Sequence, residues 1–134
     1  MNERLKAFVR QRADGRCEYC QLPQKFSLIP FEIDHVIARK HRGPTVADNL
    51  ALSCFYCNSY KGANLSGIDP ETGAVARLFD PRRQKWVRHF RWNGPYLEGR
   101  TRIGRATITV LEINHQDAVD ARRCLIEEEG FPPQ

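Results

Sequence analysis

The sequence predicts a small α+β fold built around a four-cysteine metal site. Three observations lead to this prediction: two Cys-x-x-Cys pairs, short segments that alternate between strand-like and helix-like patterns, and a length of 134 residues. A chain of this length forms a modest core with one or two appendages. Hydrophobic residues make up 41% of the chain and charged residues 28%, which is typical of a folded domain and excludes a disordered tail.

The first half of the chain is predicted to contain two helices and two strands. Residues 2–13 carry apolar side chains at helical spacing. The stretch SLIPFEIDHVIA (27–38) has the β-branched and aromatic composition of a strand. Pro30 places the start of this strand at an edge of the sheet. After a loop with a Gly-Pro turn, LALSC (50–54) predicts a second strand and YCNSYKGANL (56–65) a short helix.

The second half is predicted to form a hairpin and two helices after a turn-rich linker, IDPETGA (68–74). Residues 84–92 alternate in character and predict a strand, which an Asn-Gly-Pro turn joins to YLEG in a hairpin. Residues 103–113 and 116–129 predict helices, although TITV is poor helix composition. Three aromatic residues of the strand are expected in a small core: Trp86, Phe90 and Trp92. We expect residues 1–66 to form the core and residues 67–134 a basic extension packed on it as one structural domain.

The cysteine spacing is the most specific pattern in the chain. The two pairs, separated by 33 residues, supply four thiolates, the number that a tetrahedral structural Zn²⁺ takes. The four predicted ligands are Cys17, Cys20, Cys54 and Cys57. A redox Cys-x-x-Cys motif would need a thioredoxin-like βαβ context, which this sequence lacks. Cys124, next to Leu125 and Ile126, is expected to be a small buried apolar residue.

The net charge of +5 is spread unevenly. Residues 77–105 contain nine Lys and Arg against two acidic residues, whereas residues 106–134 contain two Arg against six acidic residues. A basic block of this kind indicates a surface that faces a polyanion, or else a solvated basic face. The arginines that we expect to contact nucleic acid are Arg82, Arg83, Arg100, Arg102 and Arg105.

The N-terminal segment is charged throughout, and the chain has no apolar run long enough to span a bilayer. We therefore expect a cytoplasmic protein with no membrane partner, in a compartment where disulfides are rare. No pattern indicates an oligomeric state.

The stretch FEIDHVIARKHRGPTVADNLALSCFYCNSYKG (31–62), with the cysteine pairs, resembles the HNH endonuclease motif. This resemblance implies a ββα-metal nuclease core with a Cys₄ zinc knuckle, and a metal-dependent enzyme that hydrolyses DNA phosphodiester bonds. It implies that His35 is the general base, that Asp34 and Asn58 bind a single catalytic divalent ion, and that Asn49 braces the loop and orients His35. Lys61, one helical turn after Asn58, is expected to contact phosphate.

Asn58 stands where many members of this family have histidine, and the HNN variant also occurs in working members. A carboxylate and an amide oxygen form a hard pair of ligands, which favours Mg²⁺ or Mn²⁺. Neighbouring residues on a regular strand face opposite ways, so Asp34 and His35 share a site only at a strand end or a bulge.

Two alternatives remain from the sequence. The first is a non-catalytic, zinc-stabilised DNA-binding module in which Asp34 and His35 are relics, and the complete Asp-His-Asn-Asn set disfavours it. The second is RNA as the substrate, because no residue pattern reports on the 2′-hydroxyl. His41, between Lys40 and Arg42, either faces phosphate or is simply solvated.

Overall fold

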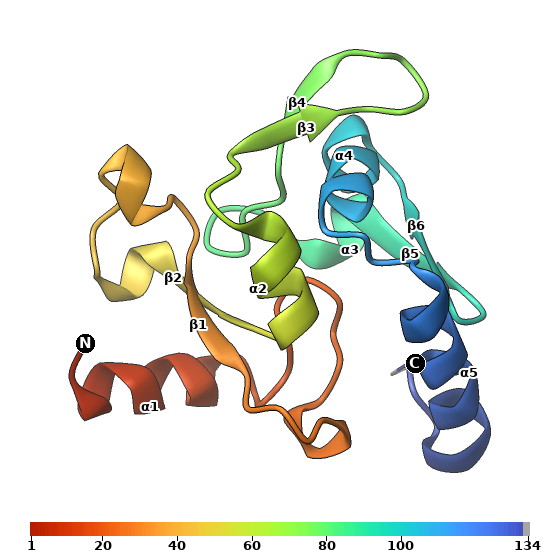
Figure 1. The fold of residues 1–134 in the computed structure, drawn as a ribbon, viewed down its shortest axis with the longest axis horizontal. Coiled ribbons are helices and arrows are strands. Elements are labelled where there is room, and N and C mark those ends of the chain that lie inside the picture. Colours follow the sequence, from red (N-terminus) through yellow and green to blue (C-terminus); the bar gives the residue numbers. More distant parts are fainter. Residues whose placement is uncertain (133–134) are drawn as a thin grey trace. The chain divides into compact units, whose positions relative to one another are not determined.

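The computed structural model describes residues 1–132 and divides the chain into two compact units. The first unit comprises residues 1–65 and 80–84, and the second comprises residues 66–79 and the chain from residue 85 onward. Helices and three two-stranded antiparallel sheets alternate along the chain (Figure 1), which confirms the predicted α+β class. The elements are α1 (Glu3–Arg12), β1 (Glu32–His35), β2 (Leu50–Ser53), α2 (Phe55–Lys61), β3 (Ser66–Ile68), β4 (Val75–Arg77), α3 (Trp86–His89), β5 (Phe90–Asn93), β6 (Tyr96–Gly99), α4 (Arg102–Val110) and α5 (Gln116–Glu129).

The first unit begins with α1, and the predicted N-terminal helix is confirmed. Asn2 caps this helix, because its Oδ1 accepts a hydrogen bond from the backbone N–H of Leu5 at 2.8 Å. At the other end, the Arg12 guanidinium donates to the carbonyl oxygens of Ala47 and Leu50 at 3.0 and 2.7 Å. These two hydrogen bonds fix the end of α1 to the start of β2.

Strands β1 and β2 form an antiparallel hairpin, in which Asp34 pairs with Ala51 and His35 with Leu50. Every residue of β2 is buried, whereas Asp34 is the one buried residue of β1. Because successive side chains of a strand point to opposite faces, Asp34 faces the core and His35 faces the other side. Both predicted strands are confirmed, although β1 is shorter than the sequence predicts.

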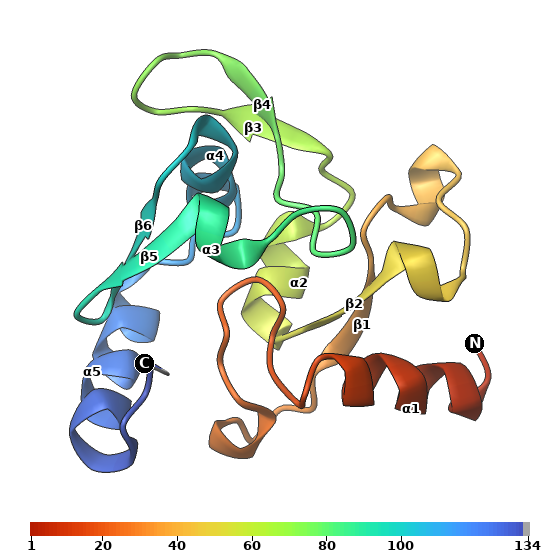
Figure 2. The same cartoon turned by 180° about the vertical axis from the view of Figure 1, so that it is seen from behind.

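Helix α2 starts directly after Cys54 and packs against β1. The Cys54 sulfur accepts a hydrogen bond from the backbone N–H of Cys57 at 3.4 Å, so the second cysteine pair also caps this helix. Gly62 ends α2 at a φ of 50°, in the left-handed region that favours glycine. Seen from both sides (Figures 1 and 2), β1, β2 and α2 make up the expected ββα unit.

The predicted linker over residues 68–74 is part of a hairpin that the sequence prediction missed. Strands β3 and β4 pair on either side of it, and Asp69 organises the turn by accepting from the Glu71 N–H and the Thr72 hydroxyl at 3.0 and 2.8 Å. Arg105 on α4 donates to both carboxylate oxygens of Asp69, at 2.8 and 2.9 Å. Each strand has only three residues, which is too short to show an alternating pattern.

The single strand predicted over residues 84–92 is wrong in its first half. Residues Trp86–His89 form the helical turn α3, and only from Phe90 onward does the chain form β5, which pairs with β6 in the predicted hairpin. Trp86 and Phe90 are four residues apart, a spacing that brings side chains together on a helix, and their ring centroids lie 5.1 Å apart. Phe90 is buried, as expected, while Trp86 and Trp92 are half-buried beside it.

Helices α4 and α5 confirm the last two predicted helices. Thr107 stabilises the unfavourable TITV stretch, since its hydroxyl donates to the Ile103 carbonyl at 2.7 Å and accepts from the Phe79 N–H at 2.8 Å. The prediction for Cys124 is wrong: its side chain is exposed, because α5 turns Val119 inward and leaves Cys124 on the outer face.

Within residues 1–132 no helix is both long and apolar enough to cross a membrane. The predicted boundary between residues 66 and 67 stays a prediction.

Candidate active site and zinc site

The four paired cysteines converge on one point of the first unit. Their sulfur atoms all lie within 4.8 Å of one another, and the sulfurs of Cys20 and Cys54 are 3.8 Å apart. Tetrahedral zinc with Zn–S bonds of about 2.3 Å places its sulfur ligands about 3.8 Å apart. The Cys20–Cys54 separation has this value. All four are buried, and the backbone N–H groups of Cys20 and Cys57 donate to the sulfurs of Cys17 and Cys54. The geometry and the donor set therefore fit a structural Zn²⁺ ion.

Two residues inside the first cysteine pair fasten this knuckle to the hairpin. The Glu18 N–H donates to the Leu52 carbonyl, and the Glu18 carboxylate accepts from the Leu52 N–H, both at 2.8 Å. Arg82 forms an ion pair with the same carboxylate. Tyr19 is fully buried, and its hydroxyl donates to Oδ2 of Asp34 at 2.7 Å. The cysteine knuckle thus holds β2 through Glu18 and β1 through Tyr19.

Asp34 forms a buried ion pair with Lys61 at the end of α2. The Lys61 Nζ lies 3.1 Å from Oδ2 of Asp34 and 3.3 Å from Oδ1, and it donates to the carbonyl oxygens of His35 and Val36 at 3.1 Å each. The side chains of Lys61 and Asp34 are only 1% and 5% exposed. Burial raises the pKa of Asp34, while the charge of Lys61 and the Tyr19 hydrogen bond act to lower it. The phosphate contact predicted for Lys61 stays a prediction, and its ammonium group is already engaged inside the unit.

Both predicted ligands of the catalytic ion retain an unused acceptor position on oxygen. A carboxylate offers about four acceptor positions, and Asp34 uses two at Oδ2 and one at Oδ1. Asn58 lies one turn before Lys61 on α2, so the two side chains share a helix face. Among residues 1–132 the Asn58 side chain has no hydrogen-bond partner. Hard oxygen donors of this kind fit Mg²⁺ or Mn²⁺.

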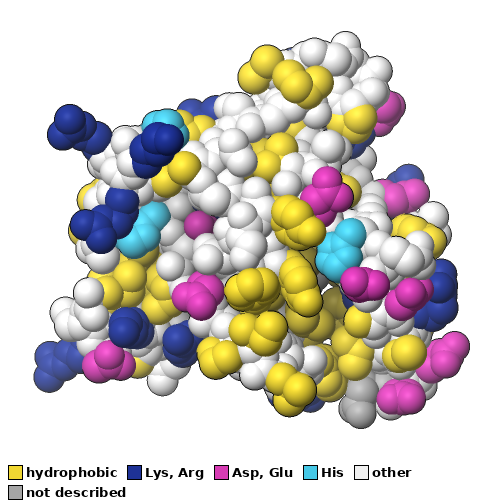
Figure 3. All heavy atoms as spheres, in the orientation of Figure 1, with side chains coloured by type: hydrophobic (Ala, Val, Ile, Leu, Met, Phe, Trp, Pro, Cys, Tyr) yellow, Lys and Arg dark blue, Asp and Glu magenta, His cyan; other side chains and the backbone are white. Residues whose placement is uncertain are grey.

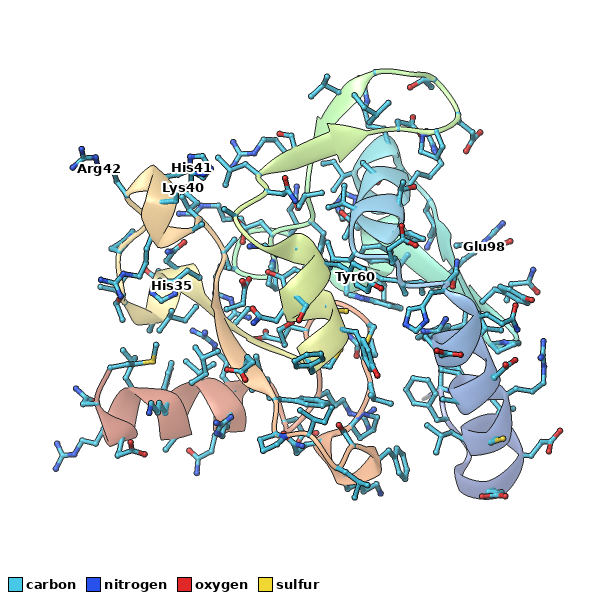
Figure 4. The ribbon with its side chains drawn as sticks, in the orientation of Figure 1. His35, Lys40, His41, Arg42, Tyr60 and Glu98 are labelled. Atoms are coloured by element: carbon cyan, nitrogen blue, oxygen red, sulfur yellow. The ribbon has the colours of Figure 1, made fainter. Side chains whose placement is uncertain are left out.

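His35 lies at the end of β1, beside the loop that follows it (Figure 4). Its Nε2 is 2.8 Å from the hydroxyl of Thr45, which orients the ring. Burial lowers the pKa of His35 below its ordinary value of 6.5; the charges of Arg39 and Lys61 lower it further, and Asp34 opposes them. These effects favour the neutral imidazole, which is the state that a general base requires.

Asn49 closes the loop between the two strands. It is 5% exposed; its Oδ1 accepts from the Ile37 N–H at 2.9 Å, and its Nδ2 donates to the carbonyls of Ile37 and Pro44 at 3.0 and 2.9 Å. Gly43 permits the loop to pack this tightly, because a Cβ at that position would collide with the Ile37 carbonyl. Asn49 therefore joins the two ends of this loop, and its predicted role in orienting His35 stays a prediction.

The predicted nucleic-acid contacts have very different surroundings. Arg82 is paired with Glu18, and Arg105 is bound by the carboxylates of Asp69 and Glu71. Arg83 is 65% exposed and forms a surface ion pair, while Arg100 and Arg102 are exposed. Arg82 and Arg83 also line an open pocket with Arg12, Asp48 and Pro81.

The sequence prediction missed Tyr19 and Thr45. Tyr19 lies between two cysteines of the buried cluster, where an aromatic side chain is held close to the core, and this position is the signal that could have indicated its burial. Thr45 is ten residues from His35 in a loop without periodicity, so no local pattern points to their contact.

Comparison with protein-family models matches residues 17–64 to a family described as HNH endonuclease. The matched segment covers rather more than a third of the chain, and contains the four cysteines, β1, β2, α2 and every proposed catalytic residue. Residues 17–64 thus match the HNH endonuclease family, as the resemblance predicts. Comparison with curated proteins and with solved structures gave no match.

We predict that Cys20→Ser abolishes zinc binding and unfolds the first unit, because structural zinc contributes about 10–16 kcal/mol to folding in small zinc domains. Cys124→Ser, on an exposed helix face, is the matched control and should retain wild-type zinc content and thermal stability. Elemental analysis and circular dichroism measure both effects. Folded, reduced Cys20→Ser protein with an unchanged melting temperature would contradict the prediction.

We predict that Lys61→Met destabilises the protein by about 3–5 kcal/mol, because it leaves the buried Asp34 carboxylate without its cation. Lys6→Met is the matched control, since Lys6 pairs with Glu3 at the surface and such pairs contribute at most about 1 kcal/mol. Urea denaturation gives both free energies of unfolding. Equal losses for the two variants would show that the Lys61–Asp34 pair has no special role.

Proposed function

We propose that this protein is a metal-dependent endonuclease that hydrolyses DNA phosphodiester bonds with one divalent ion. The observation that carries the proposal is the placement of His35, which Thr45 orients at the end of the strand that also carries Asp34, within the segment that matches the HNH family. Phosphodiester hydrolysis needs a base for the attacking water and positive charge near the scissile phosphate.

In this proposal His35 is the general base through Nδ1. The contact between Nε2 and Thr45 allows the ring to donate its Nε2 proton to the hydroxyl oxygen, which leaves the lone pair on Nδ1. Nδ1 then takes a proton from the attacking water. Asn49 supports this step indirectly. It holds the backbone of Ile37, two residues after His35, through two hydrogen bonds.

Asp34 and Asn58 would hold the divalent ion through Oδ1 of the carboxylate and the amide oxygen. When bound, a Mg²⁺ or Mn²⁺ ion supplies charge stabilisation for the phosphate oxygens and the leaving group. Lys61 and Tyr19 keep the Asp34 carboxylate in one orientation from the protein side. Two protein ligands leave the remaining positions to water and substrate, which is usual for Mg²⁺ sites.

DNA is proposed as the substrate because of the family and the excess of basic residues. The exposed candidates for phosphate contact are Arg83, Arg100 and Arg102. The other three candidates already form ion pairs with carboxylates of the protein, and each would have to share its charge between that carboxylate and a phosphate: Arg82, Arg105 and Lys61. A cytoplasmic location belongs to the same proposal, because four free cysteine ligands suit a reducing compartment.

We predict that His35→Ala retains zinc, fold and DNA binding but loses about 10²–10⁴-fold in the rate of plasmid nicking with Mg²⁺ or Mn²⁺. Thr45→Val should lose less, because it removes only the orientation of the ring. Since the pKa of His35 is lowered and the neutral form is active, the rate should fall on acidification through a pKa below 6.5 and stay level near pH 7.

Three outcomes of this experiment are informative. An unchanged rate for His35→Ala would exclude His35 as the base. An acid limb at or above pH 7 would contradict the lowered pKa of His35. If neither wild type nor variant nicks the plasmid while both bind it, the protein is a zinc-stabilised DNA-binding module and not a nuclease.

A further inference from the structure

The loop that leaves β1 carries a group of cations with no carboxylate to neutralise them. Arg39, Lys40 and Arg42 follow His35 within seven residues, and His41 lies among them. All four side chains are exposed. Within the part of the chain that the structure describes, none of the three cations has an acidic partner within ion-pair distance.

This lack of partners distinguishes the loop from three of the basic residues that were predicted to contact nucleic acid. Lys61, Arg82 and Arg105 are each paired with a carboxylate and largely buried. Their positive charges are therefore mostly neutralised by acidic residues of the protein itself. The charges of Arg39, Lys40 and Arg42 are not neutralised in this way, so they remain able to attract an anionic ligand. Figure 3 shows Lys and Arg side chains gathered with histidines on the face of the first unit that carries this loop.

The loop is also held in one shape. Residues Arg39–His41 form a 3₁₀ turn, which Arg42 ends at a φ of 67°, and the Gly43 N–H donates to the Ala38 carbonyl at 3.0 Å. Asn49 ties both ends of the loop through Ile37 and Pro44. A non-glycine residue in the left-handed region, such as Arg42, persists where surrounding contacts fix the backbone.

The loop is directed by the same contacts that orient the proposed base. Thr45, which bonds to His35, lies three residues after Arg42, and Asn49 braces the backbone between them. In Figure 4, Lys40, His41 and Arg42 lie on the same side of β1 as His35. A ligand that bridges these cations would therefore extend along the surface next to the imidazole.

We infer that the loop formed by Arg39, Lys40 and Arg42 binds the nucleic-acid sugar-phosphate backbone and presents it to His35. This inference rests on the proposed function and adds the surface that the substrate occupies. Phosphates at regular spacing match exposed, unpaired cations, and each phosphate neutralised releases about one counterion. A positioned phosphate contact contributes no sequence information, so the loop would fix the register of the strand and not its sequence.

The test compares two triple variants of equal charge by fluorescence anisotropy with a short labelled DNA duplex, with no added Mg²⁺ or Mn²⁺ so that no cleavage occurs. One variant is Arg39→Gln/Lys40→Gln/Arg42→Gln. The matched control is Arg4→Gln/Arg10→Gln/Lys25→Gln, whose side chains are exposed, belong to the same unit and form no ion pair among residues 1–132. Zinc content and circular dichroism verify that both variants are folded.

We predict that the loop variant binds about 10²-fold more weakly at low salt, with its salt slope reduced by about 2–3 units, since each phosphate contact contributes about 0.9. The control should lose much less. Wild-type affinity and slope in the loop variant, or equal losses in both variants, would overturn the inference.

The result is separable from the nuclease proposal. Loop-dependent binding by a protein that does not nick plasmid would support the loop and reject the nuclease. Nicking by a protein whose loop variant binds normally would support the nuclease and reject the loop. A wild type that shows no salt-dependent binding would reject both.

Discussion

The convergence of four cysteine sulfurs is the constraint on which the first unit depends. This unit contains about seventy residues, a size at which a hydrophobic core alone supplies little net stability. The cysteines join the segment after α1 to the end of β2 and the start of α2, so one ion would connect three elements. Because Tyr19 lies inside the knuckle and donates to Asp34, the same constraint also reaches the proposed active site.

Burial determines how the neighbouring residues Asp34 and His35 divide their roles. On the strand they face opposite ways: Asp34 points into the core, where Lys61 and Tyr19 hold it, and His35 points toward the loop and Thr45. Since His35 is the last residue of β1, the chain turns away immediately after it. Lys61 stabilises this turn through the carbonyls of His35 and Val36, which links the buried ion pair to the position of the imidazole.

Much of this arrangement follows from local sequence patterns, and the rest depends on contacts between distant residues. The Cys-x-x-Cys spacing predicts the cysteine cluster, and the resemblance of residues 31–62 to the HNH motif implies the ββα unit, because both depend on residues within the first half of the chain. The burial of Lys61 did not follow, because a lysine one turn after Asn58 has the same local pattern whether it faces solvent or Asp34. The hairpin of β3 and β4 and the helical turn α3 were missed for a related reason, since they are stabilised by α4 and by aromatic contacts across the second unit.

The central claim is that Asp34 and Asn58 hold a divalent ion beside His35, separate from zinc at the cysteines. Anomalous diffraction from crystals soaked in Mn²⁺, recorded at the zinc and manganese edges, tests it most directly. We expect a zinc peak among the four sulfurs, and a manganese peak within coordination distance of the Asp34 carboxylate and the Asn58 amide oxygen. A manganese peak that is absent there, with Asp34 held only by Lys61 and Tyr19, would contradict the account.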